Sequence, residues 1–366
     1  MKAVAPGGTI GILGGGQLGR MLALAAARLG LKAHIYCDDA DAAAAQVSDA
    51  HTVGKFDDTA ALTRFAQACD AVTLEFENVP AATVAHIATL KPMNPCARAL
   101  AITQDRFDEK SFIQSLGLTT PRFVAVDSAT DAARGFADFG GRAILKTRRF
   151  GYDGKGQAKP ASADNAAAAF RRFSAPSILE SFIDFAFEAS VIAARGADGR
   201  FAAYDPPENA HENHILRRST VPGRLTAAQG EDAKAIARKI ATALDYVGVL
   251  AVELFVMRDG SLTVNEIAPR VHNSGHWTIE ACAVSQFEQH IRAVAGWPLG
   301  DPARHADAVM ENIIGAEADA WEDYAARPGA LHLYGKGEAR AGRKMGHFTT
   351  LGPLTRGRAD NRVRPQ

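Results

Sequence analysis

Two glutamates in one stretch of the sequence could together hold a divalent cation. Glu253 and Glu266 lie in GVLAVELFVMRDGSLTVNEIA, where two alternating apolar segments flank Asp259-Gly260. Asp-Gly is a favoured two-residue turn, so the stretch predicts a β-hairpin. Counting outward from that turn places Leu254 opposite Asn265. One step further along the strands, the two glutamates face each other.

Directly opposed carboxylates repel, so a compensating charge is expected. Mg²⁺ is commonly held by one or two carboxylates together with substrate phosphates, which favours a nucleotide as the third partner, and Mn²⁺ suits the same oxygen ligands. Asn265 would add an amide oxygen, although strand alternation points it to the other face. Two other interpretations stay open: each glutamate pairs with an arginine, or a three-residue loop shifts the register and separates them.

The loop after the hairpin is typical of an anion site. It reads APRVHNSGHW and carries Arg270, His272, Asn273, Ser274 and His276. Arginine suits fork-like contacts with a carboxylate or phosphate, and the other side chains supply hydrogen-bond donors. We expect an anion to bind beside the metal.

A lysine and a glycine-rich loop form a candidate phosphate site. Lys146 lies in the apolar segment 143–147, where a lysine needs a partner. In the loop GYDGKGQ at 151–157, glycines would let backbone amides approach phosphate oxygens. Asp153 and Lys155 could reach the reacting groups when this loop closes. A plain hairpin turn is the alternative, because the spacing differs from the P-loop motif.

Three glycines near the N-terminus match a dinucleotide-binding pattern. Gly14, Gly16 and Gly19 satisfy G-x-G-x-x-G, and Asp38 follows about twenty residues later. Taken literally, the pattern predicts an NAD or FAD site, but the physics supports only amides at a helix N-terminus that face some anion. Glu75, at a later strand end, could meet ribose hydroxyls or simply be solvated. Towards the C-terminus, the cations of GKGEARAGRK suit a phosphate group, or that turn is solvated.

The elements that must position these residues follow from apolar periodicity and its breaks. We expect strands at 9–13, 31–36, 71–76, 143–147 and 330–334, helices at 17–30, 105–117, 225–247 and 279–295, a strand and turn at 178–187, and a polar loop at 204–214. Strands alternating with helices predict a parallel α/β opening.

Composition narrows the class of protein. The 366 residues allow two or three domains, and Lys+Arg and Asp+Glu balance at 41 each, so no polybasic surface for nucleic acid or membrane is predicted. The four cysteines are far apart and form no metal motif, which favours a reduced, cytoplasmic protein. The apolar segments are too short for an export signal or a membrane span.

The order of these pieces resembles the ATP-grasp ligases. GGGQLGRM, EFENVP, GYDGKGQ, GVLAVELF, VNEIAPRVHNSGHWT, SQFEQH and GRKMGH look like the 5-(carboxyamino)imidazole ribonucleotide synthases of purine biosynthesis, along nearly the whole chain. The resemblance implies α/β and α+β architecture: a Rossmann-like pre-ATP-grasp domain (1–104), an ATP-grasp domain (105–298) and a small β-rich C-terminal cap (299–366). It implies a ligase, typically a homodimer, that uses ATP, Mg²⁺ and bicarbonate to carboxylate the exocyclic amine of 5-aminoimidazole ribonucleotide, giving ADP and phosphate.

The resemblance also assigns roles to individual residues. Mg²⁺ would be bound by Glu253 and Glu266. ATP would be bound by Arg106, Lys146, Gly151, Tyr152, Asp153, Gly154, Lys155, Gly156, Gln157, Glu180, Glu188, His211, Asn265 and Glu266. The ribonucleotide and bicarbonate would be bound by Gln17, Leu18, Glu75, Tyr152, Arg270, Asn273, Ser274, Lys336, Arg343 and Lys344. The catalytic residues would be Asp153, Lys155, Arg270 and His272.

The implied mechanism passes through carboxyphosphate. ATP would phosphorylate bicarbonate, with Mg²⁺, Lys146 and Arg270 stabilising the developing charge, and the amine would attack this intermediate or the CO₂ it releases. Because carboxyphosphate hydrolyses readily, a closing loop at 151–157 has a clear purpose. Asp153 would orient or deprotonate the amine.

Three alternative functions stay open. The nearest is another ATP-grasp enzyme, such as the formate-dependent glycinamide ribonucleotide transformylase, which shares the plan. The glycine pattern suggests an NAD-dependent oxidoreductase. A non-catalytic nucleotide-binding module would leave the two glutamates of the hairpin idle.

Overall fold

The computed structural model describes residues 2–151 and 154–355. Its N-terminal part is a parallel sheet with strand order β3-β2-β1-β4, the order of half a Rossmann fold. The strands are β1 (Thr9–Leu13), β2 (Lys32–Cys37), β3 (Ala50–Val53) and β4 (Ala71–Leu74), and the helices are α1 (Gln17–Arg28), α2 (Thr59–Gln67) and α3 (Ala81–Ala88). The expected strand, glycine turn and helix are confirmed. Because β4 ends at Leu74, Glu75 lies at the carboxyl edge of this sheet.

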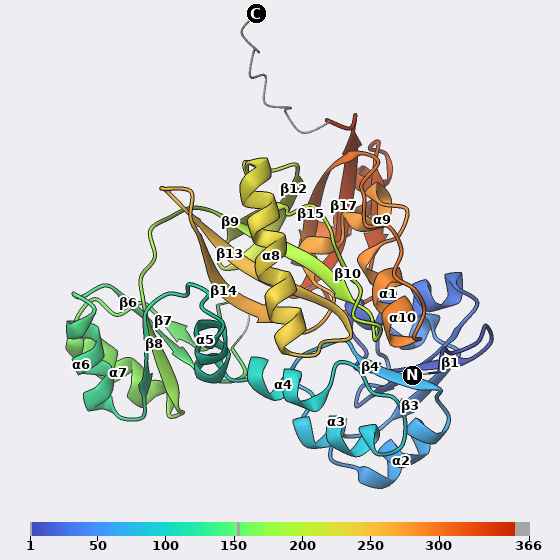
Figure 1. Cartoon of the computed structure of the whole chain (residues 1–366), viewed down its shortest axis with the longest axis horizontal. Coiled ribbons are helices and arrows are strands. Elements are labelled where there is room, and N and C mark those ends of the chain that lie inside the picture. Colours follow the sequence, from blue (N-terminus) through green and yellow to red (C-terminus); the bar gives the residue numbers. More distant parts are fainter. Residues whose placement is uncertain (1, 152–153, 356–366) are drawn as a thin grey trace, which may run out of the picture.

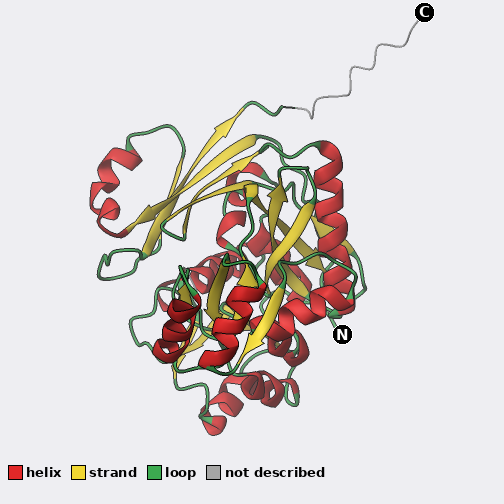
Figure 2. Cartoon of the chain, turned by 90° about the vertical axis from the view of Figure 1, so that its left-hand side faces the viewer, coloured by secondary structure: helices red, strands yellow, loops and turns green. Residues whose placement is uncertain are grey.

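A small antiparallel sheet lies at the opposite end of the long axis (Figure 1). Its order is β5-β8-β6-β7, formed by β5 (Phe123–Val126), β6 (Ala143–Thr147), β7 (Gln157–Ala158) and β8 (Ser177–Ser181). Helices α6 (Ala129–Asp138) and α7 (Ala163–Phe173) pack on it and begin at serine caps. Figure 2 views the molecule from this end.

A large antiparallel sheet joins the rest of the chain. Its order is β14-β13-β9-β11-β12-β15-β17-β16, with β10 (Phe201–Ala203) paired to β9. The strands are β9 (Phe185–Arg195), β11 (Glu208–Glu212), β12 (Ile215–Val221), β13 (Gly248–Met257), β14 (Leu262–Ala268), β15 (Asp307–Ile314), β16 (Ala330–Leu333) and β17 (Lys344–Gly352). The predicted boundary at residue 298 divides the sequence but not this sheet, because β15 pairs with β12. The division into three domains stays a prediction.

Strand alternation lets helices cover both faces of the large sheet. Along β9, Val191 and Ala193 pack with α8 (Ala227–Ala243), while Ile192 and Ala194 belong to a core that also contains α1 and α10 (Gln286–Val294). Because α1 and α10 pack together, the parallel sheet is fixed against the large one. The remaining helices are α4 (Ala97–Thr103), α5 (Arg106–Ser115), α9 (Thr278–Ala281) and α11 (Trp321–Ala325). No helix in the described part of the chain is long and apolar enough to cross a membrane.

Two predictions of secondary structure are wrong. The segment 204–214 is not only a loop, because β11 runs through it and pairs with both β9 and β12. Its polar sequence hides a strand that is held in the sheet by pairing with a strand on each side, β9 and β12. The segment 279–295 forms two helices instead of one, because the Ser285 side chain accepts a hydrogen bond from the Glu288 amide and begins α10 there.

Candidate active site

The hairpin of β13 and β14 brings two carboxylates together. Glu253 and Glu266 lie directly opposite each other, as expected. The turn differs from the prediction, because the Met257 amide donates to the Ser261 carbonyl at 2.9 Å. The loop therefore has three residues, Arg258–Gly260, instead of two.

An irregularity in β14 restores the expected pairing of the glutamates. Beyond the longer loop, Leu254 lies opposite Val264, not opposite Asn265 as predicted. The register then shifts at Asn265, as in a β-bulge, so the extra residue is absorbed before Glu266. The three-residue loop is thus real, but it does not separate the carboxylates. A bulge also interrupts strand alternation, which removes the reason for placing Asn265 on the opposite face.

Each glutamate has a cationic or imidazole partner in this structure. Arg106 Nη1 donates to Glu266 Oε2 at 3.0 Å, and His272 Nε2 lies 3.1 Å from Glu253 Oε1. The open alternative of an arginine partner is therefore correct for Glu266 alone. Burial opposes ionisation of Glu253, but His272, with His211, lowers its pKa below the ordinary value. The carboxylate form, which binds a metal, is favoured.

Lys146 has the partner that its apolar strand requires. Its Nζ donates to Glu180 Oε2 at 2.9 Å, and Lys110 Nζ, from α5, lies 3.5 Å from the other oxygen. Lys110 also donates to the Asn265 carbonyl at 2.8 Å, so it links this cluster to the bulge. Although burial favours the neutral acid, the two lysines lower the pKa of Glu180 to about 2. Sequence reasoning missed Lys110, for which the only local signal was its place beside the buried face of α5.

The lid, residues 151–157, connects the strands β6 and β7. Its ends are paired, with Lys146 opposite Gln157, and Arg106 Nη2 donates to the Gly151 carbonyl at 3.1 Å. Gly154 and Gly156 have left-handed φ values of 79° and 69°, which favour glycine. A Cβ at Gly154 would lie 2.8 Å from His214, so the lid approaches the β11–β12 turn. Tyr152 and Asp153 lie outside the described residues.

His211 and Glu188, both predicted to bind ATP, are paired with each other. They lie on neighbouring strands, and His211 Nδ1 is 2.6 Å from Glu188 Oε2. Burial alone would lower the pKa of His211, but Glu188 outweighs this effect and raises it. This pairing gives His211, predicted to lie in a loop, a fixed position on β11.

Arg270 connects the carboxylate pair with the parallel sheet. Its guanidinium grips Glu77 with two hydrogen bonds, one from Nε to Oε2 and one of 3.0 Å from Nη2 to Oε1. Burial opposes the charge of Arg270, but Glu77 outweighs it and raises the pKa, helped by Glu75 and Glu266. Arg270 also lowers the pKa of Glu77 to about 2 against the effect of burial. Glu77 was not among the predicted site residues, although it follows the same strand as Glu75.

Buried hydroxyl groups hold His272 in place. Its Nδ1 lies 2.8 Å from Ser274 Oγ, which is 2.7 Å from Ser190 Oγ, and Asn209 Nδ2 donates to Ser190 Oγ at 2.9 Å. Ser274 is fully buried, and the buried Asn273 side chain exchanges hydrogen bonds with Asn312. Both predicted substrate-binding side chains are therefore engaged inside the protein, where they shape the loop.

A cavity of about 470 Å³ lies at the carboxyl edge of the parallel sheet. Its lining includes Gly16, Asp38, Glu75, Lys336 and Arg343. This volume suits a small-molecule ligand. The lining combines cations of the C-terminal segment with several carboxylates, a composition that suits a phosphate together with hydroxyl groups.

The amides at the start of α1 are already engaged by the protein's own carboxylate. Gly16 and Gly19 amides donate to the two oxygens of Glu75 at 2.7 and 2.9 Å. Burial raises the pKa of Glu75 against these hydrogen bonds. A dinucleotide phosphate could not occupy the same amides, so the literal interpretation of the glycine pattern is wrong.

Of the other predicted ribonucleotide contacts, Lys336 and Arg343 line this cavity, whereas Gln17, Leu18 and Lys344 are not part of its lining. Gln17 is half-buried at the start of α1, and the Leu18 side chain packs in the core. Lys336 Nζ donates to the Lys344 carbonyl at 2.7 Å, and Arg343 Nη1 donates to the Glu338 carbonyl at 2.9 Å. Lys344 also helps to lower the pKa of Glu253.

Comparison with known proteins agrees with this geometry. Family models described as a ribonucleotide synthetase preATP-grasp domain, an ATP-grasp domain and a phosphoribosylaminoimidazole carboxylase C-terminal domain match residues 8–104, 111–287 and 308–358. The chain is 51% identical to the N5-carboxyaminoimidazole ribonucleotide synthase of Brucella melitensis, over 96% of this chain and 98% of that protein.

Solved structures of N5-carboxyaminoimidazole ribonucleotide synthases are also similar to this chain. The ADP complex of an N5-carboxyaminoimidazole ribonucleotide synthetase has a TM-score of 0.93 and 40% identity, covering 97% of this chain and 95% of that one. The Aspergillus clavatus enzyme with ADP and 5-aminoimidazole ribonucleotide has a TM-score of 0.89 and 32% identity, covering 95% and 94%. The predicted ATP-grasp fold is confirmed. This chain belongs to the N5-carboxyaminoimidazole ribonucleotide synthase family of ATP-grasp ligases.

Proposed function

We propose that the chain carboxylates the exocyclic amine of 5-aminoimidazole ribonucleotide with ATP and bicarbonate, in purine biosynthesis. The position of Arg270 carries the proposal. Arg270 follows β14, which carries Glu266. Its two hydrogen bonds to Glu77 fix the guanidinium beside the strand end that carries Glu75. One guanidinium can therefore serve both the phosphate-activating site and the ribonucleotide site. A small anion held there lies between the two reactants.

The carboxylate pair fits Mg²⁺, or Mn²⁺ in its place. Glu253 and Glu266 supply hard oxygen ligands from adjacent strands, and the Arg106 and His272 contacts show that the pair attracts positive charge. When bound, the cation would neutralise charge on the ATP phosphates during transfer.

The first step is phosphoryl transfer to bicarbonate. Lys146 and the lid amides from Gly151 to Gln157 hold the ATP phosphates, and His211 and Glu188 position the nucleoside. A bicarbonate oxygen attacks the γ-phosphorus, the bond to ADP breaks, and carboxyphosphate forms. Arg270 and Lys155 stabilise the charge that develops on the transferred group.

The second step transfers the carboxyl group to the amine. The amine nitrogen attacks the carboxyphosphate carbonyl or the CO₂ it releases, phosphate departs, and the nitrogen loses a proton. His272 is held by Glu253 and Ser274 at one edge of the reacting centre. Asp153, outside the described residues, stays our predicted group for orienting the amine. A closed lid would exclude water, which otherwise hydrolyses carboxyphosphate.

We also propose an oligomeric state and a cellular compartment for this chain. We expect a homodimer, which sedimentation would test. The four cysteines are free, which supports work in a reducing cytoplasm.

The test is ADP release by the purified chain with Mg-ATP. Bicarbonate and 5-aminoimidazole ribonucleotide added together should stimulate release strongly, and either one alone should not. Stimulation by formate with glycinamide ribonucleotide instead would keep the fold and replace the substrates. A lack of stimulation by either pair would support a non-catalytic module.

A further inference from the structure

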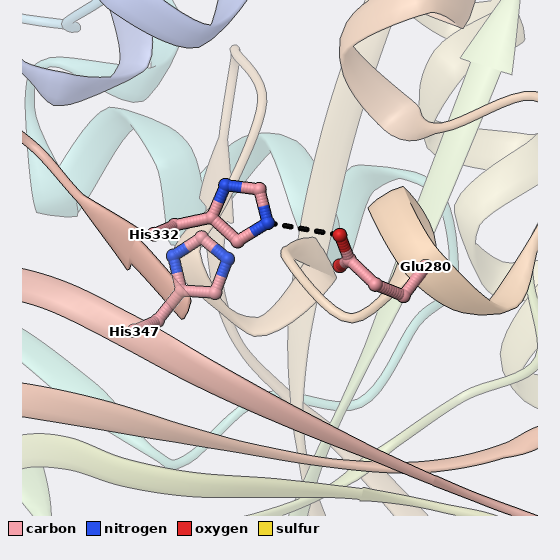
Figure 3. Close-up of side chains that lie close together, drawn as sticks. All are labelled: Glu280, His332 and His347. Atoms are coloured by element: carbon pink, nitrogen blue, oxygen red, sulfur yellow. Dashed lines mark hydrogen bonds and ion pairs between the residues drawn. The ribbon is translucent and has the colours of Figure 1, made fainter. Parts of the chain in front are cut away.

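Three metal-ligating side chains meet outside the active site. Glu280 comes from α9, His332 from β16 and His347 from β17, and their ligand atoms all lie within 4.8 Å of one another. Among the described residues, this is the one such group of three histidine, cysteine, aspartate or glutamate side chains. Figure 3 shows both imidazoles with a nitrogen turned toward the carboxylate.

Part of this cluster is unsatisfied. His332 Nε2 and Glu280 Oε1 are 2.9 Å apart, which accounts for one imidazole and one oxygen. The buried His347 Nε2 and the buried Glu280 Oε2 have no hydrogen-bond partner in the described part of the protein. Orphaned polar atoms at full burial are costly. When the proton of His347 is on Nδ1, its Nε2 and Glu280 Oε2 both present lone pairs to the same small space, which points to a missing cation.

The surroundings of His347 fix its ring for ligation. Its Nδ1 lies 2.8 Å from the hydroxyl of buried Tyr334, the outer-shell contact that metal-bound histidines commonly make through their second nitrogen. The ring stacks on the partly exposed His332 with centroids 4.5 Å apart and planes inclined by 6°, so His332 must tilt out of this stack for both Nε2 lone pairs to point at one ion.

We propose that Glu280, His332 and His347 form a binding site for a divalent transition metal of the zinc type. Two imidazoles and one carboxylate are a three-ligand set that Zn²⁺ accepts with a further ligand from solvent. Mg²⁺ prefers oxygen ligands, so this site and the Glu253–Glu266 pair select different ions.

The proposed site lies between two segments of the candidate active site. Lys336 follows β16 and Lys344 begins β17, and α9 directly follows the loop that carries Arg270 and His272. A bound metal would link the segment between β16 and β17 to the loop that precedes α9. Its effect would be structural, on the mutual position of the ribonucleotide-binding and catalytic segments.

The test uses the full chain without a histidine tag, freed of metal and titrated with Co²⁺ under excess Mg²⁺ and ADP. We expect one Co²⁺ per chain with the strong visible absorption of a four-coordinate site, displaced by Zn²⁺. His332→Ala, at a partly exposed position, and Glu280→Gln should weaken binding by at least about 100-fold, more than loss of an outer-shell partner costs.

His51→Ala is a matched control. Cys37 Sγ and His51 Nε2 lie 3.3 Å apart and are a second pair of side chains that could bind Co²⁺, so this substitution should leave the Co²⁺ spectrum unchanged if our assignment holds. Zn²⁺ should also raise Tm in the wild type and in His51→Ala, and not in His332→Ala. Absence of Co²⁺ binding by the wild type, or equal binding by His332→Ala, would overturn the proposal and leave the cluster as a hydrogen-bonded ion pair.

Discussion

Glu253 and Glu266 lie directly opposite each other on β13 and β14, beside a register shift at Asn265. The shift ties the carboxylate pair to the rest of the site, because the Asn265 carbonyl accepts a hydrogen bond from buried Lys110. Lys110 in turn lies beside Glu180, the partner of Lys146. The groups that would hold the cation and the phosphates are therefore parts of one connected cluster.

Glu266→Gln should abolish ADP formation while leaving the fold intact. The amide keeps the size of the side chain and a contact to Arg106 but removes the charge that would hold a cation, so we expect kcat to fall by about 10²-fold or more. Steady-state ADP release measures the effect, and Glu231→Gln on the exposed face of α8 is the matched control. Turnover close to the wild-type value would show that the pair is idle.

Glu77→Gln should act through Arg270. Without the carboxylate, the guanidinium loses its two-point anchor, and we expect kcat/KM for bicarbonate to fall by roughly tenfold to a hundredfold. Arg270→Lys keeps the charge but loses the fork. Because both variants remove the same contact, their effects in the double variant should combine to less than their sum. Fully additive losses would count against Glu77 as a positioning residue.

Ser274→Ala should loosen His272 without touching the substrates. The hydroxyl is buried and lies 2.8 Å from His272 Nδ1, so its loss removes the contact that orients the ring. We expect kcat to fall about tenfold with KM for ATP nearly unchanged, and Ser190→Ala, one hydroxyl further away, to have a smaller effect. A rise in KM for ATP with unchanged kcat would point instead to a disturbed nucleotide site.

Glu180 should make stability depend on pH in the acid range. Lys110 and Lys146 lower its pKa from 4.5 to about 2 in the folded protein, so its contribution is complete above pH 4.5 and is lost as the pH falls towards 2. The free energy of unfolding of Glu180→Gln should thus be below that of the wild type at pH 7, and roughly 2 kcal/mol of the gap should close between pH 7 and pH 3. Urea unfolding from pH 7 to pH 3 measures it. A gap that does not change with pH would contradict this role.

The sequence predicted those parts of the fold that depend on local pattern. The strands β1 and β6, the helices α1 and α5, and the facing glutamates are where periodicity, caps and turn residues place them. The prediction that the two glutamates face each other is confirmed although the predicted turn was one residue too short. The bulge in β14 absorbs the extra residue before Glu266. No local signal distinguishes a two-residue from a three-residue loop once a bulge is available.

The site residues and contacts that the sequence did not predict depend on pairs of residues that are far apart in the chain. Glu77 and Arg270 are 193 positions apart, and Lys110 meets Asn265 across 155 positions, so neither pairing leaves a trace in a local window. Gly16 and Gly19 looked like phosphate ligands because the sequence could not show that Glu75 already accepts their hydrogen bonds. Buried Asn273 looked like a surface donor for the same reason, since its partner is Asn312.

Bicarbonate labelled with ¹³C and ¹⁸O, supplied with Mg-ATP and 5-aminoimidazole ribonucleotide, would show whether the chain carboxylates the amine through carboxyphosphate. We expect ¹³C in an acid-labile carboxyl group on the amine of the ribonucleotide, one ADP for each carboxyl group, and one ¹⁸O in the released phosphate. ADP release with no ¹³C in the ribonucleotide would contradict carboxylation, and ¹³C transfer without ¹⁸O in phosphate would contradict the route through carboxyphosphate.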